Sequence, residues 1–268
     1  MESKGVRLDA WLVEHGFAGG RDKAKELLAA GTVTVNGKQV TKPAARIADT
    51  DVVVCGADKP RYVGRGGHKL EKAITAAHLS VDGAVAMDVG ASTGGFTDCM
   101  LQHGAAHVYA VDVGHDQLHP TLRQDSRVTV LEGTDIRSEA LATAVAAGSV
   151  TFCSVDVSFV SLAHVLPAIL PYLAADGVLV CLIKPQFEAG KSDIGKRGVV
   201  KDKRVHARVL GEQLALFSRL GLATSWLSHS PITGGEGNIE YLAVLRTQGE
   251  NGVFDPLAVA AAAFDELG

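Results

Sequence analysis

The chain has 268 residues and a net charge of −4. Its length and its hydrophobic content of 47% are sufficient for one large domain and one small domain, each with a buried core. No apolar run approaches the roughly 18 residues that span a bilayer, and the first residues, MESKGVRLDAWL, hold no apolar region of a secretory signal, so we expect neither a membrane protein nor a secreted one. Four cysteines stand far apart without CxxC spacing, which argues against a structural zinc site or disulfides and favours a reducing cytoplasm.

Residues 1–58 predict a small α+β domain. RLDAWLVEHG and RDKAKELLAAG are typical of short amphipathic helices that end at glycine, and TVTVNGKQV of two strands joined by an Asn-Gly turn. DTDVVVCG adds a strand, and ADKPRYVGRGG indicates a linker over residues 59–66. Residues 1–70 carry 12 Lys and Arg against 8 Asp and Glu, whereas the rest of the chain is acidic, so the small domain is expected to face a polyanion.

Strands and helices alternate over residues 67–247, which predicts an α/β domain with a doubly wound parallel sheet. Its strand-like segments are AVAMDVG, HVYAVDVG, RVTVLEGTD, VTFCSVDVSF and VLVCLIKPQFE. After a long helix at about residues 205–220, ATSWLSHSPI and EYLAVLR predict an antiparallel pair at the sheet edge. Residues 248–268 form a tail with a short helix capped by Asp255.

The segment MDVGASTGGFTD, residues 87–98, joins the first strand of this sheet to its helix. Its glycines allow a tight turn and let a ligand approach the N-terminus of the helix. The dinucleotide pattern would need glycine where Ser92 stands, and no G-K-[ST] follows as in a P-loop.

Acidic residues end successive strands, at the edge where open sheets bind ligands. They are Asp88, Asp112, Asp135 and Asp156. Carboxylates suit a cationic ligand with hydroxyl and amine groups rather than one dominated by phosphates, and S-adenosylmethionine fits this description. Asp112 follows Asp88 at about the offset at which an acid binds the ribose in Rossmann sheets. The alternative for each acid is a helix N-cap. The predicted cofactor-binding residues are Asp88, Gly90, Ala91, Ser92, Thr93, Gly94, Gly95, Phe96, Asp112, Val113, Asp135, Ile136 and Asp156.

The segments RGGHKL, DVGASTGGFTD, VDVSFVSL, LIKPQFE and GNIEYL follow GTVTVNG in this order, and together they resemble the TlyA family over residues 5–246. Members of that family are known as ribosomal RNA 2′-O-methyltransferases or as haemolysins. The resemblance implies an N-terminal alpha-L RNA-binding domain and an FtsJ-like, Rossmann-like class I methyltransferase domain with a seven-stranded sheet. It also implies S-adenosylmethionine as cofactor, ribosomal RNA or a ribosomal subunit as partner, a cytidine as target, and no metal. The Lys-Asp-Lys-Glu tetrad of the class would be Lys69, Asp156, Lys184 and Glu240.

Ribose methylation requires a hydroxyl aligned with the methyl carbon and a group that takes its proton. A lysine accepts a proton only in its neutral form, which burial beside another cation favours. Lys184, at the end of a buried strand, is the candidate base, with Asp156 holding it and Glu240 orienting Lys69 or the hydroxyl. Carboxylates too close to the lysine would keep it protonated, so the division of roles among the four stays open. Two alternatives stay open. Lys184 could reach solvent like most lysines at strand ends, or the four residues could form a structural ion-pair cluster.

Other methylation chemistries fit less well. Amine methylation is typical of [DN]-P-P-[FYW], but this chain has D-V-S-F at that place. Methylation at C5 of a pyrimidine needs a cysteine nucleophile, whereas Cys153 and Cys181 lie inside predicted strands as core residues.

RNA contacts are expected from cations of the small domain, from the segment after the linker, and from the basic run GKSDIGKRGVVKDKRVHAR, which could equally be a solvated loop. They are Arg7, Arg21, Lys23, Lys25, Lys42, Arg65, His68, Lys191, Lys196 and Arg197. The low aromatic content, 5%, favours recognition of a folded RNA over stacking on a long single strand. The rival functions are a membrane-lytic protein and a non-catalytic ribosome assembly factor.

Overall fold

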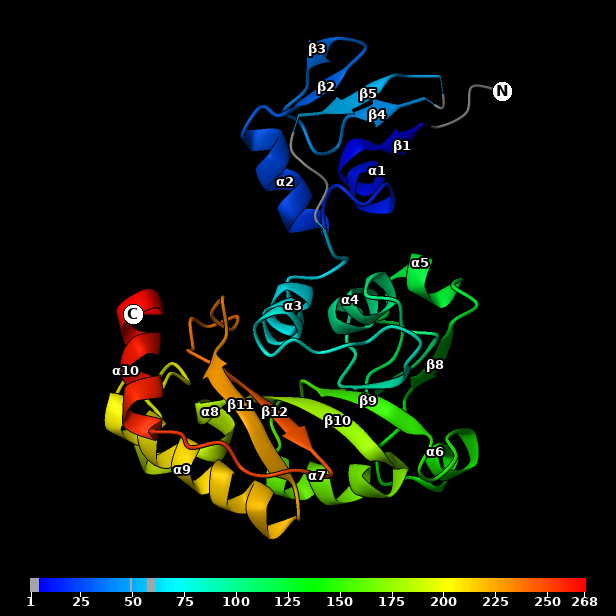
Figure 1. The fold of residues 1–268 in the computed structure, drawn as a ribbon. Helices are drawn as coiled ribbons and strands as arrows, with labels where there is room; N and C mark the ends of the chain where they lie inside the picture. The colour runs from blue at the N-terminus through cyan, green and yellow to red at the C-terminus, as the bar shows by residue number, and fades with distance from the viewer. Residues whose placement is uncertain (1–4, 49, 57–60) are drawn as a thin grey trace. The chain divides into compact units, whose positions relative to one another are not determined.

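A computed structural model describes residues 5–48, 50–56 and 61–268. The chain divides into two compact units, Met1–Gly64 and Arg65–Gly268, which are described separately below (Figure 1). Parts of the predicted small domain and of the predicted linker, residues 1–4, 49 and 57–60, lie outside the described residues. The finer division into domains, linker and tail stays a prediction.

The first unit contains the two predicted helices and two small antiparallel sheets. A two-stranded sheet pairs β1 with β4, and a three-stranded sheet has the order β3-β2-β5. The β2–β3 turn uses Asn36 and Gly37, both at positive φ, as the Asn-Gly signal predicts. Leucines from both helices pack against Val33 and Ile47 in the core. The elements are β1 (Val6–Arg7), α1 (Leu8–Glu14), α2 (Arg21–Ala29), β2 (Val33–Val35), β3 (Lys38–Gln39), β4 (Arg46–Ile47) and β5 (Val53–Cys55).

The second unit is built on a seven-stranded sheet of order β11-β12-β10-β9-β6-β7-β8. The strands from β10 to β8 are parallel, and β12 is antiparallel to both of its neighbours, which confirms the predicted sheet and its late antiparallel pair. The strands are β6 (Val85–Val89), β7 (His107–Asp112), β8 (Val128–Glu132), β9 (Val150–Val155), β10 (Leu173–Ile183), β11 (Ala223–His229) and β12 (Tyr241–Arg246).

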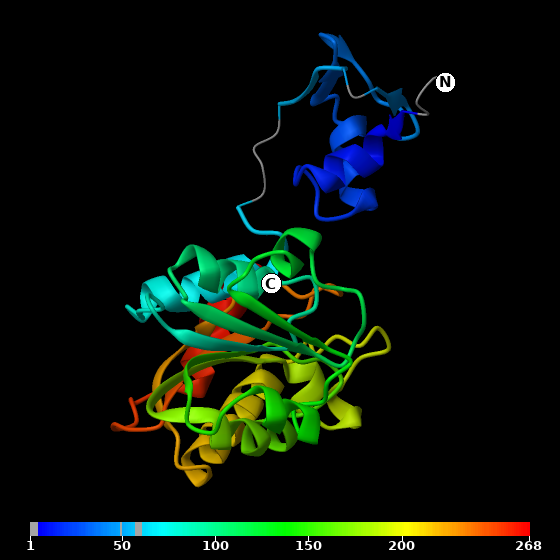
Figure 2. The same cartoon turned by 90° about the vertical axis from the view of Figure 1, so that its right-hand side faces the viewer.

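Helices cover both faces of this sheet, with α3 and α4 on one face and α7 and α9 on the other (Figure 1, Figure 2). The last helix, α10, packs against α9 and β11, and Asp255 caps its N-terminus by accepting from the backbone N–H of Leu257, as predicted. The helices are α3 (Gly66–Ala76), α4 (Gly95–Gln102), α5 (Pro120–Arg123), α6 (Glu139–Ala144), α7 (Leu162–Ile169), α8 (Pro185–Glu188), α9 (Lys203–Arg219) and α10 (Pro256–Leu267), with short 3-10 turns at Leu170–Tyr172 and Lys191–Asp193. No helix in the described ranges is long and apolar enough to cross a bilayer.

The strand β10 ends where the apolar run of VLVCLIKPQFE ends, and the last five residues of that segment lie outside the strand. The last strand residue of β10 is Ile183, and Pro185 begins the short helix α8, for which proline at the first helical position is well suited. Lys184 therefore stands between strand and helix, at the carboxyl edge of the sheet. Residues 179–183 are buried, which explains their continuous apolar sequence.

The turn after β6 approaches the end of β9 closely. Gly90 has φ +85°, and a Cβ there would lie 2.4 Å from the carbonyl oxygen of Asp156. The backbone N–H of Asp156 donates to the carbonyl of Val89 at 2.9 Å. Only glycine satisfies both the conformation and the space at position 90.

Replacing Gly90 by alanine is therefore expected to destabilise the protein more than the same change at Gly83. Gly83 also has a positive φ, +69°, but an added Cβ would meet nothing within 4 Å. Gly83→Ala should lower the free energy of unfolding by about 1 kcal/mol, and Gly90→Ala by about 3 kcal/mol or more, because backbone must move. Denaturant unfolding measures both, and equal losses would contradict the close contact.

Candidate active site

Two adjoining cavities open at the carboxyl edge of the sheet. The larger has a volume of about 570 Å³ and the smaller about 190 Å³, and both are lined by Gly90, Ser92 and Asp156. Of the residues predicted to bind the cofactor, the larger cavity also takes Asp112, Val113, Asp135 and Ile136. The smaller cavity also takes Ala91, Thr93, Gly95 and Phe96.

Asp112 lines the larger cavity and is held by two backbone N–H groups. Its Oδ2 accepts from the N–H of Ser92 at 2.8 Å and its Oδ1 from the N–H of Gly114 at 2.7 Å. Each carboxylate oxygen has a second lone-pair direction, so Asp112 can still accept from hydroxyls of a ligand.

Asp135 has a cationic partner within its own turn. Its carboxylate accepts from Nε of Arg137 at 2.8 Å and from Nη2 at 2.7 Å. The guanidinium of Arg137 lowers the pKa of Asp135 to about 2, so the carboxylate is charged at neutral pH. Asp135 therefore reaches the cavity as half of an ion pair.

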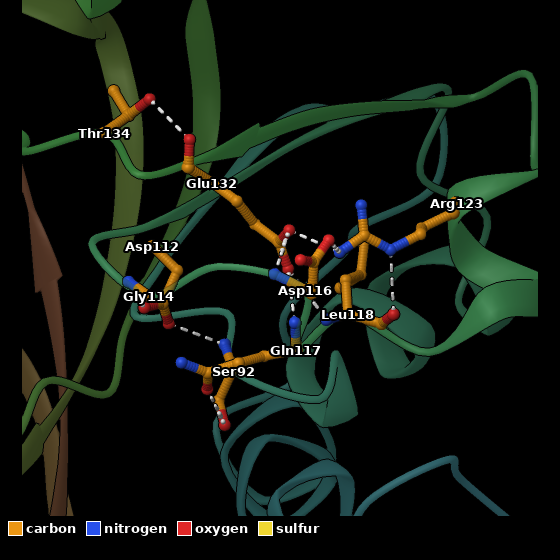
Figure 3. Close-up of polar contacts among 9 residues, drawn as sticks. All are labelled: Ser92, Asp112, Gly114, Asp116, Gln117, Leu118, Arg123, Glu132 and Thr134. Carbon is orange, nitrogen blue, oxygen red and sulfur yellow. Dashed lines mark hydrogen bonds and ion pairs between the residues drawn. The ribbon is translucent and has the colours of Figure 1, made fainter.

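Glu132 was missed by the sequence analysis, although it follows the strand-like run RVTVL. Figure 3 shows its side chain reaching the loop after β7, where it accepts from the N–H groups of Asp116 at 2.8 Å, Gln117 at 2.9 Å and Leu118 at 2.8 Å. It also pairs with Arg123. Burial opposes its charge, but these donors outweigh burial and lower the pKa of Glu132 to about 2. Glu132 thus fixes a loop whose Gln117 lines the larger cavity.

Asp88 points into the protein rather than into either cavity. It is 0% exposed and accepts from the hydroxyls of Thr97 at 2.7 Å and Ser154 at 2.9 Å. Burial raises its pKa to about 6, against the effect of these two hydrogen bonds. Asp88 therefore links β6 to α4 and β9 and lines neither cavity. Gly94, which was also predicted to bind the cofactor, has φ +95° directly before α4 and lines neither cavity as well.

The four predicted tetrad residues form two buried ion pairs. Nζ of Lys184 lies 2.6 Å from Oδ1 of Asp156, and Nζ of Lys69 lies 2.6 Å from Oε2 of Glu240. Both lysines are 8% exposed and Glu240 is 3% exposed, whereas the side chain of Asp156 is half-buried, at 20% exposed. Lys184 therefore does not reach into solvent as an ordinary lysine at a strand end would.

A hydroxyl that the sequence analysis missed completes the surroundings of Lys184. Ser158, in the D-V-S-F segment, accepts from the Lys184 ammonium at 2.9 Å. Asp156 and Lys69 both line the smaller cavity, so each ion pair has one member at its wall. Cys153 and Cys181 are buried core residues of β9 and β10, and burial raises the pKa of both thiols, which suits no nucleophile.

The predicted RNA contacts are mostly exposed but differ in how they are held. Arg7 is bound to the buried Asp9 of its own unit, with its Nη2 at 2.6 Å from Oδ2. Lys23 and Lys25 form ion pairs within their helix, and these pairs are weak because they are exposed to solvent. Arg65 lines the smaller cavity, and His68 lies beside Glu71. The remaining predicted contacts are exposed: Arg21, Lys42, Lys191, Lys196 and Arg197.

The residues that line the larger cavity fit S-adenosylmethionine. Its wall combines the carboxylates of Asp112 and Asp156 with apolar side chains such as Ile136 and Val157, and its one arginine, Arg137, is paired with Asp135. Such a wall favours a cation with hydroxyls and an aromatic base over a polyphosphate. Among the residues that the structure describes, no group of three His, Cys, Asp or Glu side chains could hold a metal ion.

Known proteins resemble this chain in sequence and in fold. A TlyA protein of Mycobacterium tuberculosis, named 16S/23S rRNA (cytidine-2′-O)-methyltransferase, is 43% identical over 91% of this chain and 90% of its own. A solved Streptococcus thermophilus protein that carries a hemolysin name is 42% identical, with a TM-score of 0.75 over 98% of this chain and 97% of its own. An S-adenosylmethionine dependent methyltransferase from Mesorhizobium loti shares the fold, at 18% identity and a TM-score of 0.51 over 68% of this chain and all of its own.

Two family models match separate parts of the chain. The S4 domain model matches residues 6–53, which include both helices of the first unit. The FtsJ-like methyltransferase model matches residues 62–247, which include the whole seven-stranded sheet and all four residues of the two ion pairs. The chain therefore belongs to the FtsJ-like methyltransferase family.

Proposed function

We propose that this protein transfers a methyl group from S-adenosylmethionine to a ribose 2′-hydroxyl in ribosomal RNA, at a cytidine, in the cytoplasm. The observation that carries the proposal is the pair of buried ion pairs, Lys184–Asp156 and Lys69–Glu240, at a cavity suited to that cofactor. Similarity to a relative named as an rRNA (cytidine-2′-O)-methyltransferase supports the choice of substrate.

The cofactor would be held by the two cavities. Asp112 would accept hydrogen bonds from its ribose hydroxyls, Ile136 and Val113 would contact its base, and the turn around Gly90 and Ser92 would follow its amino-acid part. Bound in this way, S-adenosylmethionine supplies a methyl group on a positively charged sulfur. Asp156, which lines both cavities, places a negative charge beside that region.

Lys184 would take the proton from the ribose hydroxyl. The ammonium would first release a proton to solvent, and the neutral amine would then accept the hydroxyl proton as the oxygen attacks. The ammonium that forms again is stabilised by Asp156 at 2.6 Å and by the hydroxyl of Ser158 at 2.9 Å. Desolvation strengthens both contacts, because the side chain is almost fully buried.

Lys69 and Glu240 would orient the hydroxyl. Lys69 lines the smaller cavity and can donate to the ribose oxygens, while Glu240 holds its ammonium from behind at 2.6 Å. A non-catalytic assembly factor would gain nothing from two lysines buried beside a cofactor cavity, since buried pairs contribute little net stability.

RNA binding would involve exposed cations on both units. The first unit offers Arg21 and Lys42, and the segment after α8 offers Lys191, Lys196 and Arg197. Their charges would neutralise phosphates without reading sequence. The hemolysin name of a relative supports a lytic protein as the second candidate, and leakage from liposomes that survives Lys184→Ala would support it further.

Purified protein incubated with ribosomal subunits and methyl-labelled S-adenosylmethionine should yield labelled 2′-O-methylcytidine after digestion to nucleosides. The label should reside on the ribose, because Lys184 as proposed takes a hydroxyl proton, and Cys153 and Cys181 are buried core residues unsuited to attack a base. Label on a nucleobase with an unmodified ribose would refute the proposed chemistry.

Lys184→Arg should lower kcat by a factor of about 100 or more, because a guanidinium keeps the charge but cannot accept a proton. Lys184 lines neither cavity, so the affinity for S-adenosylmethionine, measured by calorimetry, should stay within about threefold. A variant that retains most of its turnover would exclude Lys184 as the base.

Lys196→Glu combined with Arg197→Glu should weaken binding to ribosomal RNA and reduce its dependence on salt, because two phosphate contacts are lost. Titration of RNA at several salt concentrations measures this slope, and Arg219→Glu, at an exposed arginine in the last turn of α9, tests for a general effect of charge. An unchanged slope for the double variant would place the segment after α8 outside the RNA interface.

A further inference from the structure

A fifth side chain joins the two ion pairs. Gln186 lies in α8, two residues after Lys184, and its amide nitrogen donates to Oε1 of Glu240 at 3.3 Å. The other oxygen of Glu240, Oε2, accepts from Lys69 at 2.6 Å. Gln186 therefore ties the segment that carries Lys184 to the pair formed by Lys69 and Glu240.

Of the two polar atoms of the Gln186 amide, only the nitrogen has a hydrogen-bond partner among the described residues. Its Oε1 is buried and has no hydrogen-bond partner within the part of the chain that the structure describes. A buried carbonyl oxygen without a partner is unfavourable, and turning the amide over would set this oxygen against the Glu240 carboxylate. The contact with Glu240 is thus kept at the expense of the other end of the amide.

A neutral donor is the group that this place requires. Glu240 and Lys69 already balance each other in charge, and Lys184 and Asp156 do the same. A cation at position 186 would compete with Lys69 for Glu240, whereas an anion would repel Glu240. The amide occupies the free oxygen of Glu240 and leaves both charge balances unchanged.

We propose that Gln186 is a positioning residue for methyl transfer, which holds Glu240, and through it Lys69, in place relative to Lys184. The inference rests on the proposed function. Gln186 lines neither cavity, so it acts through Glu240 and not on a ligand. Its loss is expected to affect kcat and to spare the binding of S-adenosylmethionine.

Gln213 in α9 provides a matched control. Its amide nitrogen donates to Oε2 of Glu188 at 3.0 Å, and its Oε1 is also buried without a partner among the described residues. It is 6% exposed, and Glu188 binds Ser161 and the N–H of Leu162 rather than a member of the two ion pairs. Replacing glutamine by glutamate at either position sets a second carboxyl group beside a carboxylate, but only at position 186 is that carboxylate Glu240.

The test follows kcat of Gln186→Glu and Gln213→Glu, relative to wild type, from about pH 5 to about pH 9. A protonated glutamic acid can donate to Glu240 as the amide does, whereas the ionised form repels it. The relative kcat of Gln186→Glu should therefore fall about tenfold as the pH rises, with KM for S-adenosylmethionine within about twofold. The relative kcat of Gln213→Glu should not depend on pH.

Two further measurements separate folding from catalysis. Gln186→Met keeps the length of the side chain without its donor, and it should lower kcat about tenfold at every pH. Both glutamate variants should lose thermal stability relative to wild type as the pH rises above about 4.3, because the folded carboxyl pair retains a proton that the unfolded chain releases.

The outcomes distinguish the role of Gln186 from the proposed methyl transfer. An active wild-type protein with a flat relative kcat for Gln186→Glu, or an equal fall for Gln213→Glu, overturns the role of Gln186 alone. A wild-type protein that methylates no ribose overturns the proposed function, and the positioning role with it. A fall confined to Gln186→Glu, at unchanged KM, supports the role.

Discussion

The close approach of Gly90 to the backbone of Asp156 is the constraint on which the rest of the site depends. It exists because β6 and β9 are parallel neighbours whose carboxyl ends meet, with the N–H of Asp156 bonded to the carbonyl of Val89 at 2.9 Å. The glycine turn and Asp156 thereby share the walls of both cavities, and the ion pair at 2.6 Å places Lys184 from the next strand. One contact of main chain with main chain thus positions the walls of both cavities and the ion pair of Asp156 with Lys184.

The acidic residues at this edge of the sheet all stand at or next to the end of a strand, but they differ in their surroundings. Asp112 and Asp156 face cavities, whereas Asp88 is enclosed with two hydroxyls and has its pKa raised to about 6 by burial. Donors around Glu132 have the opposite effect and lower its pKa to about 2 in spite of burial, so it anchors a loop as a fixed charge. Environment divides these acidic residues into those that face a cavity and those that hold the structure together.

Much of this arrangement could be predicted from the sequence, because alternating strands and helices imply a parallel sheet and long motifs identify Lys69, Asp156, Lys184 and Glu240. The inward turn of Asp88 could not, because a residue at a strand end can face either side. Gln186 could not either, since its partner is reached only through the register of β10 with β12, which pairs Ile183 with Tyr241. Strands buried on both faces lack the alternation that reveals such a register.

The strand β12 is the last of its sheet along the chain, yet it lies between β11 and β10. During translation the chain therefore makes Lys69, Asp156 and Lys184 well before Glu240, and β10 keeps an unpaired edge until its neighbour emerges. The four side chains of the two ion pairs can therefore come together only after the segment with Glu240 has been made. For a protein proposed to modify ribosomes, a nascent chain without that segment lacks the carboxylate that pairs with Lys69.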